Sequence, residues 1–402
     1  MEKWSCLNCE MIYEPDIYFP FCRQCNSPLI VWSKKKGRRF DLSRPSCLEK
    51  FKSFLPLSRI NKNLLLGEGN TPLIRLFRLE KKLEAPFPIY AKNEMANPTH
   101  SFKDRGTAVV IQKAVAGQIK KIGTVSTGNM AASTAAYGAK AGLKTFILLK
   151  EDASFEKTLS TGVYGAHLIS VKGDYGGLFK QSYEIGKKIG IYFANSCDPY
   201  RLEGYKLTSF EIYFQLGQKA PEYLFVPVSS GGHLVGLLLG FLELKREGYI
   251  RQLPHFIGLQ ARGCSPIVEA WEKNLTDIIP VKNPQTLAHA ISNPSPPAGR
   301  LVLKLLYQYG GQMIGVTDEE IMRAQAELAS FEGLFCDPAS ATTLAGLKKW
   351  RRLNPEVKPR EAVLVITGSG LKDLSPVKER GKISLIPVRL PCLEEALVSL
   401  AL

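Results

Sequence analysis

The chain has 402 residues, and its 53 Lys and Arg against 37 Asp and Glu give a formal net charge of +16. Hydrophobic residues make up 45% and charged residues 22%, which excludes a disordered chain, a collagen-like chain and a small disulfide-stapled protein. The best apolar run, 234–242, is far shorter than the roughly 20 residues that cross a bilayer, and the first residues lack the apolar stretch of a secretory signal. We therefore expect a cytoplasmic protein without a membrane partner. Its charge suits nucleic acid, an anionic surface or small anions.

Four of the nine cysteines form two Cys-x2-Cys pairs at the start of the chain: Cys6, Cys9, Cys22 and Cys25. Four thiolates with this spacing can surround a Zn²⁺ ion tetrahedrally, and the metal would stabilise a segment too short to fold alone. We predict a zinc-ribbon-like knuckle over residues 1–33. Iron is a less favoured metal, and four unrelated reduced thiols are the alternative. The other cysteines are isolated and are interpreted as buried or incidental thiols.

A basic run with the sequence KKKGRR follows the knuckle at 34–39. It could bind nucleic acid. No aromatic residues that could stack on bases are interleaved with it. We therefore interpret 34–63 as a basic linker and lead-in to the main body.

From residue 64 onward, short apolar runs alternate with helical patterns. Strands are predicted at 89–91, 122–125, 145–149, 167–171, 223–228, 255–259 and 362–366, and helices at 129–141, 176–189, 317–329 and 340–352. Thr317 and Glu320 form a capping-box pair at the start of the third helix. This alternation predicts an α/β fold with a mostly parallel sheet and helices on both faces. Ligands of such folds bind beyond the carboxyl ends of the strands.

Three strand-to-helix turns carry polar residues or glycine at those ends. Ser126, Thr127 and Asn129 follow the strand 122–125 and open a helix, whose free N–H groups suit a carboxylate. The second turn consists of Ser229, Ser230, Gly231, Gly232 and His233. Its glycines allow the backbone to wrap closely around a phosphate, although a plain tight turn has the same composition. Thr367 opens the third turn, Thr-Gly-Ser-Gly, after the strand 362–366.

Lys103 lies in the segment NPTHSFKDRG at the predicted start of a further helix. The helix dipole and desolvation can lower the pKa of a lysine in this position, which would make it a Schiff-base nucleophile. A lysine in a mixed-charge segment is more often simply solvated. From the residues alone, both interpretations stay open.

Together, these segments resemble the fold-type II pyridoxal-phosphate enzymes, and among them the threonine synthases. The resemblance rests on six segments in the family's order: GEGNTPL (67–73), NPTHSFKDRG (97–106), STGNMAAS (126–133), NSCDPYRLEGYKLTSFEI (195–212), CDPASATTLAGL (336–347) and TGSGLKD (367–373). It implies a tryptophan synthase β-like fold, with two lobes of mostly parallel sheet and the cofactor in the cleft. The catalytic domain would span 64–402, with a smaller lobe at about 107–205.

The resemblance also implies roles for single residues. Lys103 would hold pyridoxal 5'-phosphate covalently, Asn129 would bond the ring hydroxyl and Thr367 would meet the ring nitrogen. The turn 229–233 would bind the cofactor phosphate. Ser101, Ser126 and Thr127 would contact the substrate, the last two at its carboxylate. The substrate's own phosphate would be bound by Asn195, Ser196 and Arg201, since a guanidinium suits a dianion.

The implied reaction converts O-phospho-L-homoserine and water to L-threonine and phosphate, in an enzyme expected to be a homodimer. Four departures from the family pattern bear on the substrate: His100, Met130, the SSGGH turn and Cys197-Asp198. They keep an alternative open, in which a related enzyme exchanges the phosphate of O-phospho-L-serine for sulfite or sulfide, as cysteate synthase does.

A hypothesis of another class is a zinc-ribbon nucleic-acid binder with an inert, enzyme-like body. Lys103, Asn129 and Thr367 argue against it, because an inert body has little reason to keep that set. We therefore expect a small anionic, phosphorylated amino acid as the partner, and no nucleic acid.

Overall fold

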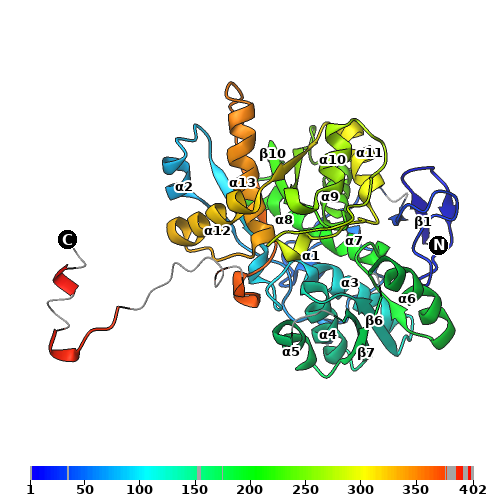
Figure 1. Cartoon of the computed structure of the whole chain (residues 1–402). Coiled ribbons are helices and arrows are strands. Elements are labelled where there is room, and N and C mark those ends of the chain that lie inside the picture. Colours follow the sequence, from blue (N-terminus) through cyan, green and yellow to red (C-terminus); the bar gives the residue numbers. More distant parts are fainter. Residues whose placement is uncertain are drawn as a thin grey trace.

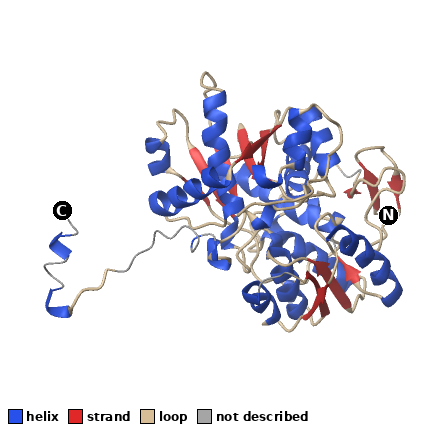
Figure 2. Cartoon of the chain, in the orientation of Figure 1, coloured by secondary structure: helices blue, strands red, loops and turns tan. Residues whose placement is uncertain are grey.

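The computed structural model describes the chain except for residues 1, 34–35, 152–154, 174, 376, 378–385, 393–396 and 400–402. Two lobes of strands and helices lie one above the other in Figure 1, and a small N-terminal sheet lies at their side. Figure 2 shows that the strands of each lobe are enclosed by helices. The α/β fold with mostly parallel sheets is confirmed.

The N-terminal sheet consists of three short antiparallel strands in the order β2-β1-β3. They are β1 (Lys3–Cys6), β2 (Ile12–Tyr13) and β3 (Leu29–Trp32). Trp4 of β1 is fully buried and meets Tyr200 of the main body edge to face, with ring centroids 5.5 Å apart. The sheet is therefore docked on the body.

The larger lobe contains a six-stranded sheet in the order β12-β11-β10-β13-β5-β4, parallel except for β4. Its strands are β4 (Leu73–Arg75), β5 (Ile89–Asn93), β10 (Tyr223–Pro227), β11 (His255–Ala261), β12 (Gln312–Val316) and β13 (Ala362–Ile366). Its helices are α2 (Phe77–Lys82), α8 (Leu207–Gln215), α9 (Gly232–Arg246), α10 (Pro266–Glu272), α11 (Gly299–Tyr309), α12 (Asp318–Glu332) and α13 (Pro338–Leu353).

The sheet of the larger lobe is buried on both faces, as its apolar strands require. Leu224 and Val226 of β10 belong to the same hydrophobic cluster as residues of α8, α9 and α11. Phe225, which points the other way, packs in a cluster with α12 and α13. Continuous apolar runs in the sequence therefore correspond to strands between two helical layers.

The smaller lobe contains a parallel sheet in the order β8-β7-β6-β9. Its strands are β6 (Lys121–Val125), β7 (Lys144–Lys150), β8 (His167–Val171) and β9 (Tyr192–Phe193). The remaining helices are α1 (Cys47–Lys50), α3 (Lys103–Ala116), α4 (Asn129–Lys140), α5 (Phe155–Gly162), α6 (Tyr175–Ile189) and α7 (Pro199–Tyr205). Helices α3 and α7 approach each other so closely at Gly204 that a side-chain methyl group there would overlap the carbonyl of Arg105.

The predicted elements agree closely with the structure. The strands at 167–171 and 362–366 have the predicted bounds, and the capping box of Thr317 and Glu320 is present. The strands β4, β9 and β12 were not predicted; two of them have three residues or fewer, and all three lie at sheet edges. No helix of the described chain is long and apolar enough to span a membrane.

Part of the predicted basic linker packs against the larger lobe. Residues 34–35 lie outside the described chain. Arg38 is 7% exposed and forms an ion pair with Glu243, with 3.1 Å between Nη1 and Oε2. Its backbone N–H donates to Glu247 and its carbonyl accepts from Tyr249. Arg38 is thus held by the protein rather than presented to a nucleic acid.

Candidate active site

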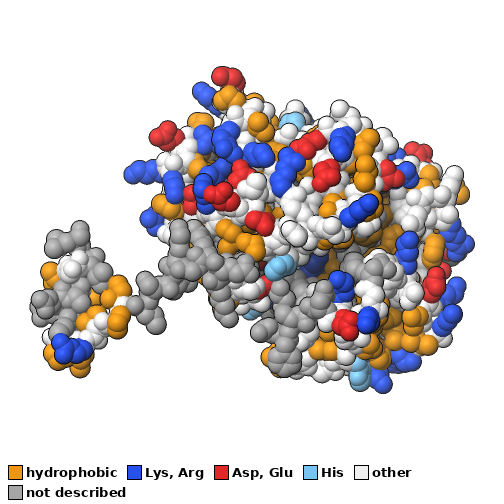
Figure 3. Space-filling view, viewed as in Figure 1, with side chains coloured by type: hydrophobic (Ala, Val, Ile, Leu, Met, Phe, Trp, Pro, Cys, Tyr) orange, Lys and Arg blue, Asp and Glu red, His pale blue; other side chains and the backbone are white. Residues whose placement is uncertain are grey.

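The segments carrying the predicted site residues meet where the lobes face each other, and the surface in Figure 3 is hollowed between the lobes. The residues preceding Lys103 pair with the turn after β13: Phe102 N–H donates to the carbonyl of Thr367 at 3.0 Å. Ser369 N–H donates to the carbonyl of His100 at 3.1 Å. These bonds fix Lys103 beside the Thr-Gly-Ser-Gly turn.

His100 occupies the left-handed region, with a φ of 58°. Glycine adopts this conformation without strain, whereas a residue with a Cβ does so at a cost. His100 is one of the departures from the family pattern, which usually has glycine next to Ser101. The chain keeps the turn despite the strain, because its carbonyl is held by Ser369.

Lys103 is the first residue of α3, and its side chain is only half-buried. Its Nζ lies 4.3 Å from the centroid of the Phe102 ring and 5.9 Å from that of Tyr205. No carboxylate lies within ion-pair distance of Nζ among the described residues. Desolvation, followed by the positive charge of Arg201, lowers the pKa of Lys103 to about 7. An amine in this state is a nucleophile near neutral pH.

The turn 229–233 forms a backbone cradle between β10 and α9. Gly231 has a φ of 90°, and a Cβ there would lie 2.8 Å from Val302 Cγ2 and 2.9 Å from Ala298 Cβ. The N-terminus of the 15-residue helix α9 follows, so unpaired backbone N–H groups face the turn. Glycines, N–H groups and the hydroxyls of Ser229 and Ser230 are what a bound phosphate requires.

The last residue of the cradle, His233, is buried and lies against the lysine segment. Its ring stacks on Phe102, with centroids 3.7 Å apart and an interplanar angle of 20°. Burial and the charges of Lys103 and Arg105 hold its pKa well below the usual range, so the ring is neutral. Neither ring nitrogen has a hydrogen-bond partner in the part of the chain that the structure describes.

The loop after β9 brings its residues beside the cradle. The carbonyl of Ser196 lies where a Cβ on Gly232 would approach it to 2.8 Å. Asn195 is fully buried and ties this loop to β6, because its Oδ1 accepts from Val125 N–H at 2.8 Å. Its Nδ2 donates to Ser182 at 3.0 Å. The predicted substrate-phosphate segment and the predicted cofactor-phosphate turn are therefore neighbours.

Arg201 is fully buried on α7, and three protein oxygens fix its guanidinium. Nε donates to the carbonyl of Ala194 at 2.8 Å, Nη1 to Thr107 at 2.7 Å and Nη2 to Thr134 at 2.9 Å. All three acceptors are neutral, and two of the five N–H groups remain. No carboxylate forms an ion pair with Arg201 among the described residues. The three neutral acceptors hold the guanidinium in place, and its charge acts both on Lys103 and on the buried carboxyl of Asp198, whose pKa it lowers against the effect of burial.

Ser126 and Thr127 lie half-buried at the end of β6, one turn before α4. Ser126 Oγ accepts from Gly128 N–H at 3.3 Å. Ser101 is fully buried, and the described chain offers its Oγ no hydrogen-bond partner. The hydroxyl of Ser101, two residues before Lys103, is therefore free to hydrogen-bond a ligand.

The turn after β13 rests on the N-terminus of α13. Thr367 Oγ1 lies 3.0 Å from Ser340 Oγ, which donates to Asp337 Oδ1 at 2.6 Å. The Asn129 amide lies beside the Asp337 carboxyl at Gly368 and acts to lower its pKa. Burial raises the pKa of Asp337 to about 6. The two side chains predicted to face the cofactor ring, Asn129 and Thr367, therefore share one buried carboxyl group.

These residues fit pyridoxal phosphate. The group needs an amine for its aldehyde, donors for its phosphate and polar side chains for its ring. The chain provides the unpaired amine of Lys103, the cradle at Gly231, and Asn129 with Thr367. The unpartnered hydroxyl of Ser101 and ring nitrogens of His233 indicate that the hollow is built for a polar ligand.

Comparisons with known proteins agree with this class of site. Residues 64–368 match the family described as pyridoxal-phosphate dependent enzyme. The fold is shared with serine racemase of maize, at a TM-score of 0.65 and 18% identity over 78% of this chain and 93% of that one. It is also shared with an L-serine ammonia-lyase of Rhizomucor miehei, at a TM-score of 0.66 and 20% identity over 79% and 99%. The chain is thus a fold-type II pyridoxal-phosphate-dependent enzyme.

Comparison with curated relatives identifies the family within this class of enzymes. A threonine synthase of Methanocaldococcus jannaschii is 40% identical over 92% of this chain and 92% of its own length. Those of Methanosarcina acetivorans and Halalkalibacterium halodurans are 35% and 38% identical, over 93% and 87% of this chain and 93% and 95% of their own lengths. The chain belongs to the threonine synthase family.

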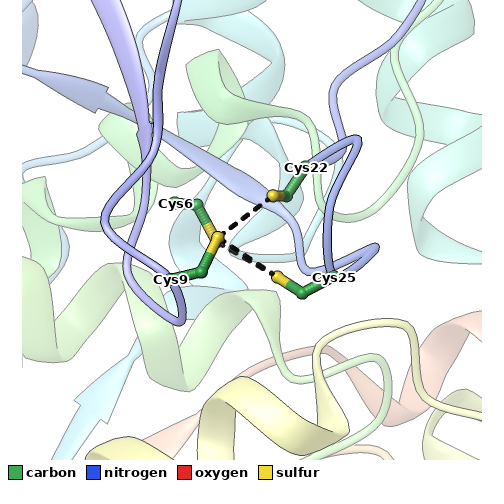
Figure 4. Close-up of side chains that lie close together, drawn as sticks. All are labelled: Cys6, Cys9, Cys22 and Cys25. Atoms are coloured by element: carbon green, nitrogen blue, oxygen red, sulfur yellow. Dashed lines mark hydrogen bonds between the residues drawn. The ribbon is translucent and has the colours of Figure 1, made fainter.

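The four N-terminal cysteines converge as their spacing predicts. Their sulfur atoms all lie within 4.8 Å of one another (Figure 4). Cys6 and Cys25 are 3.5 Å apart, and Cys9 and Cys22 are 3.3 Å apart. A tetrahedral ion with Zn–S bonds of about 2.3 Å needs S···S separations of about 3.8 Å. The cluster can hold a metal ion.

Sequence reasoning gave no role to several residues of the site. Asp337 and Ser340 lie inside one of the segments that carry the resemblance. Thr107 and Thr134 hold Arg201. Cys197 is a buried thiol near Lys103, and burial raises its pKa to about 12. Asp337 could have been found as the residue before Pro338, which is a helix N-cap signal. Nothing in the sequence indicates which residues the guanidinium meets.

Proposed function

We propose that this enzyme converts O-phospho-L-homoserine and water to L-threonine and phosphate. The observation that carries the proposal is Arg201, a buried guanidinium near the lysine amine whose hydrogen bonds all go to neutral oxygens. An enzyme acting on unphosphorylated serine or threonine has no use for such a charge, because burying it costs several kcal/mol unless an anion neutralises it. A phosphate on the substrate supplies that anion.

Lys103 would hold the cofactor covalently, with its phosphate in the turn 229–233 and its ring between Asn129 and Thr367. When bound, the cofactor stabilises negative charge that develops next to the amino group of the substrate. Ser126 and Thr127 would bind the substrate carboxylate at the N-terminus of α4, with Ser101 beside them. Asn195, Ser196 and Arg201 would bind the substrate phosphate.

The amine of Lys103 is the chain's own base in this reaction. With a pKa of about 7, it can take one proton from Cα and one from Cβ, and return one to Cγ as phosphate leaves and one to Cα at the end. Phosphate departs from Cγ by cleavage of the C–O bond, and water adds at Cβ. Histidine is not needed as a base, which agrees with the depressed pKa of His233.

Incubation of the holoenzyme with O-phospho-L-homoserine tests this proposal. We expect threonine and phosphate in equal amounts, with neither formed by Lys103→Ala. Parallel incubation with O-phospho-L-serine and sulfite tests the cysteate synthase alternative. Cysteate from the second mixture and no threonine from the first would replace the proposal with that alternative.

We also propose that Cys6, Cys9, Cys22 and Cys25 bind a structural zinc ion. Their spacing, their convergence and the small size of the sheet support it. Elemental analysis of the purified protein should find one zinc per chain, lost in Cys22→Ser. Iron at the same stoichiometry would correct the identity of the metal.

The enzyme is further proposed to work in the cytoplasm as a homodimer. Eight cysteines of the described chain carry free thiols, which suits a reducing compartment. The dimer follows from the family resemblance. Light scattering should give a mass twice that of one chain, and a mass equal to one chain would refute the dimer.

A further inference from the structure

A buried carboxyl group, Asp337, lies at the junction of the two side chains proposed to face the cofactor ring. It is 7% exposed and caps the N-terminus of α13, accepting from Ser340 N–H at 2.8 Å. Its second oxygen lies against Gly368, where a Cβ would come within 2.6 Å of Asp337 Oδ2 and 3.0 Å of Asn129 Nδ2. Gly368 thus leaves room for the Asn129 amide to reach the carboxylate.

Ser340 connects this carboxyl group to the turn of Thr367. A serine oxygen has one hydrogen to donate and two lone pairs to accept with. The hydrogen goes to Asp337 Oδ1 at 2.6 Å, the nearest of three possible acceptors; the others are Thr367 Oγ1 at 3.0 Å and the carbonyl of Gly368 at 3.3 Å. The lone pairs accept from the backbone N–H groups of Thr367 at 2.9 Å and Gly368 at 3.0 Å.

The hydroxyl of Thr367 therefore finds no free site on Ser340, although the two oxygens are 3.0 Å apart. Ser340 is its only hydrogen-bond neighbour among the residues that the structure describes. The hydrogen of Thr367 is consequently left to point into the cleft. A hydroxyl so oriented is a hydrogen-bond donor, which suits an unprotonated ring nitrogen.

We propose that Asp337 is a positioning residue for the cofactor ring, acting through Ser340 on Thr367 and directly on Asn129. Through Ser340 it makes the Thr367 hydroxyl a donor toward the ring nitrogen. Through its second oxygen it accepts one hydrogen of the Asn129 amide and leaves the other for the ring hydroxyl. The inference rests on the proposed placement of the ring between Asn129 and Thr367.

Two substitutions distinguish the effect of Asp337 on Asn129 from its effect on Thr367 through Ser340. Asp337→Asn keeps a helix N-cap, but it turns an N–H toward the amide of Asn129. Ser340→Ala cuts the link to Thr367. Thr317→Ala is the control, because it removes an N-cap from α12 without contact to the site. The dissociation constant of pyridoxal phosphate, the visible absorption band and the melting temperature of the cofactor-free protein are measured for each.

We expect Asp337→Asn and Ser340→Ala to bind the cofactor about 10-fold more weakly and to shift its absorption band, with Thr317→Ala unchanged in both. With saturating cofactor, kcat should fall while KM for the phosphorylated substrate stays within about threefold. Cofactor affinity and absorption band equal to those of wild type in both variants would overturn the proposal.

If a variant does not fold, the pair Thr367→Ser and Thr367→Val decides. The serine variant keeps the hydroxyl and should match wild type, and the valine variant should lose affinity and shift the band. Equal behaviour of the two contradicts the role of the hydroxyl. A wild-type protein that binds pyridoxal phosphate but forms no threonine would refute the proposed reaction alone, because the binding measurements remain valid.

Discussion

At the scale of single residues, the amine of Lys103 lies among aromatic rings and near a buried guanidinium. Desolvation of the amine and, after it, repulsion by Arg201 disfavour its charged form. Arg201 is kept in place by three neutral oxygens, and its charge acts on Lys103 as well as on the carboxyl of Asp198. The guanidinium thus lowers the pKa of the lysine, and it is the group that we propose binds the substrate phosphate.

The pKa of Lys103 predicts how cofactor uptake depends on pH. Only the neutral amine attacks the aldehyde, so uptake by the cofactor-free protein should be slow below pH 7 and fast above it. With a pKa of about 7, the initial rate at pH 8 should exceed that at pH 6 about tenfold. The rise of the visible absorption band measures it. A midpoint near 10, the value of a solvated lysine, would contradict the environment described for this amine.

Helix α9 has a glycine with positive φ at each end, and the two glycines differ in their surroundings. Gly231 precedes the helix with a φ of 90°, and Gly248 follows it with a φ of 81°. Around Gly248 a Cβ would meet open space, whereas around Gly231 it would meet Val302 and Ala298. The two positions share the backbone strain but differ in their surroundings.

Substitution of each glycine by alanine should therefore distinguish the cost of backbone strain from the loss of phosphate binding. Gly248→Ala should cost about 1 kcal/mol of stability and leave cofactor binding intact. Gly231→Ala should lose more stability and most of its affinity for pyridoxal phosphate, because the cradle must open. Thermal unfolding and cofactor titration of both variants test this. Equal cofactor affinity in the two would show that the turn does not hold the phosphate.

The N-terminal sheet is an element whose stability depends on its docking. The Trp4 ring packs on Tyr200 of α7. The carboxylate of Glu2 accepts hydrogen bonds from Lys113 and Tyr200. On the other side, Lys304 of α11 donates to the carbonyls of Leu7 and Asn8. Figure 1 shows the sheet against α11 and α6. These contacts link the cysteine knuckle to both lobes.

Trp4→Ala should lower the free energy of unfolding by about 3–5 kcal/mol, because it empties a buried site of this size. Phe77→Ala, which removes a ring that is 61% exposed, is the control and should change it by about 0.5 kcal/mol at most. Chemical denaturation measures both. Equal effects would mean that the knuckle does not stabilise the body.

The sequence predicts elements and local motifs better than it predicts their partners. The bounds of β8 and β13 follow from apolar runs alone, and Lys103, Gly231 and Thr367 were found by their turns. The bonds of Arg201 to Thr107 and Thr134 could not be predicted, because they join residues 94 and 67 positions apart. Tertiary packing, and not local pattern, decides such contacts.

At the scale of the whole molecule, a buried charge network joins the lobes. Arg105 of α3 bonds Glu94 and Glu211 at 2.8 and 2.7 Å, and Lys92 of β5 bonds Glu211 at 2.6 Å. All four side chains are buried, and two positive charges balance two negative ones. The positive charges visible in Figure 3, by contrast, spread over both lobes and gather over α12 and α13.

Glu211→Gln should destabilise the protein by about 3–5 kcal/mol, because it leaves an uncompensated charge in the interior. Glu319→Gln removes an exposed carboxylate paired with Arg323 and should cost about 0.5 kcal/mol or less. The free energies of unfolding of the two variants give the comparison. A cost for Glu211→Gln no greater than that of the surface pair would mean that the network is not the joint between the lobes.

In the proposed reaction, phosphate leaves Cγ by carbon–oxygen cleavage while water adds to the neighbouring carbon, Cβ. Turnover of O-phospho-L-homoserine in water enriched in oxygen-18 tests it most directly, with both products analysed by mass spectrometry. We expect the label in the hydroxyl of threonine and none in the phosphate. Label in the phosphate, with homoserine as the other product, would contradict it.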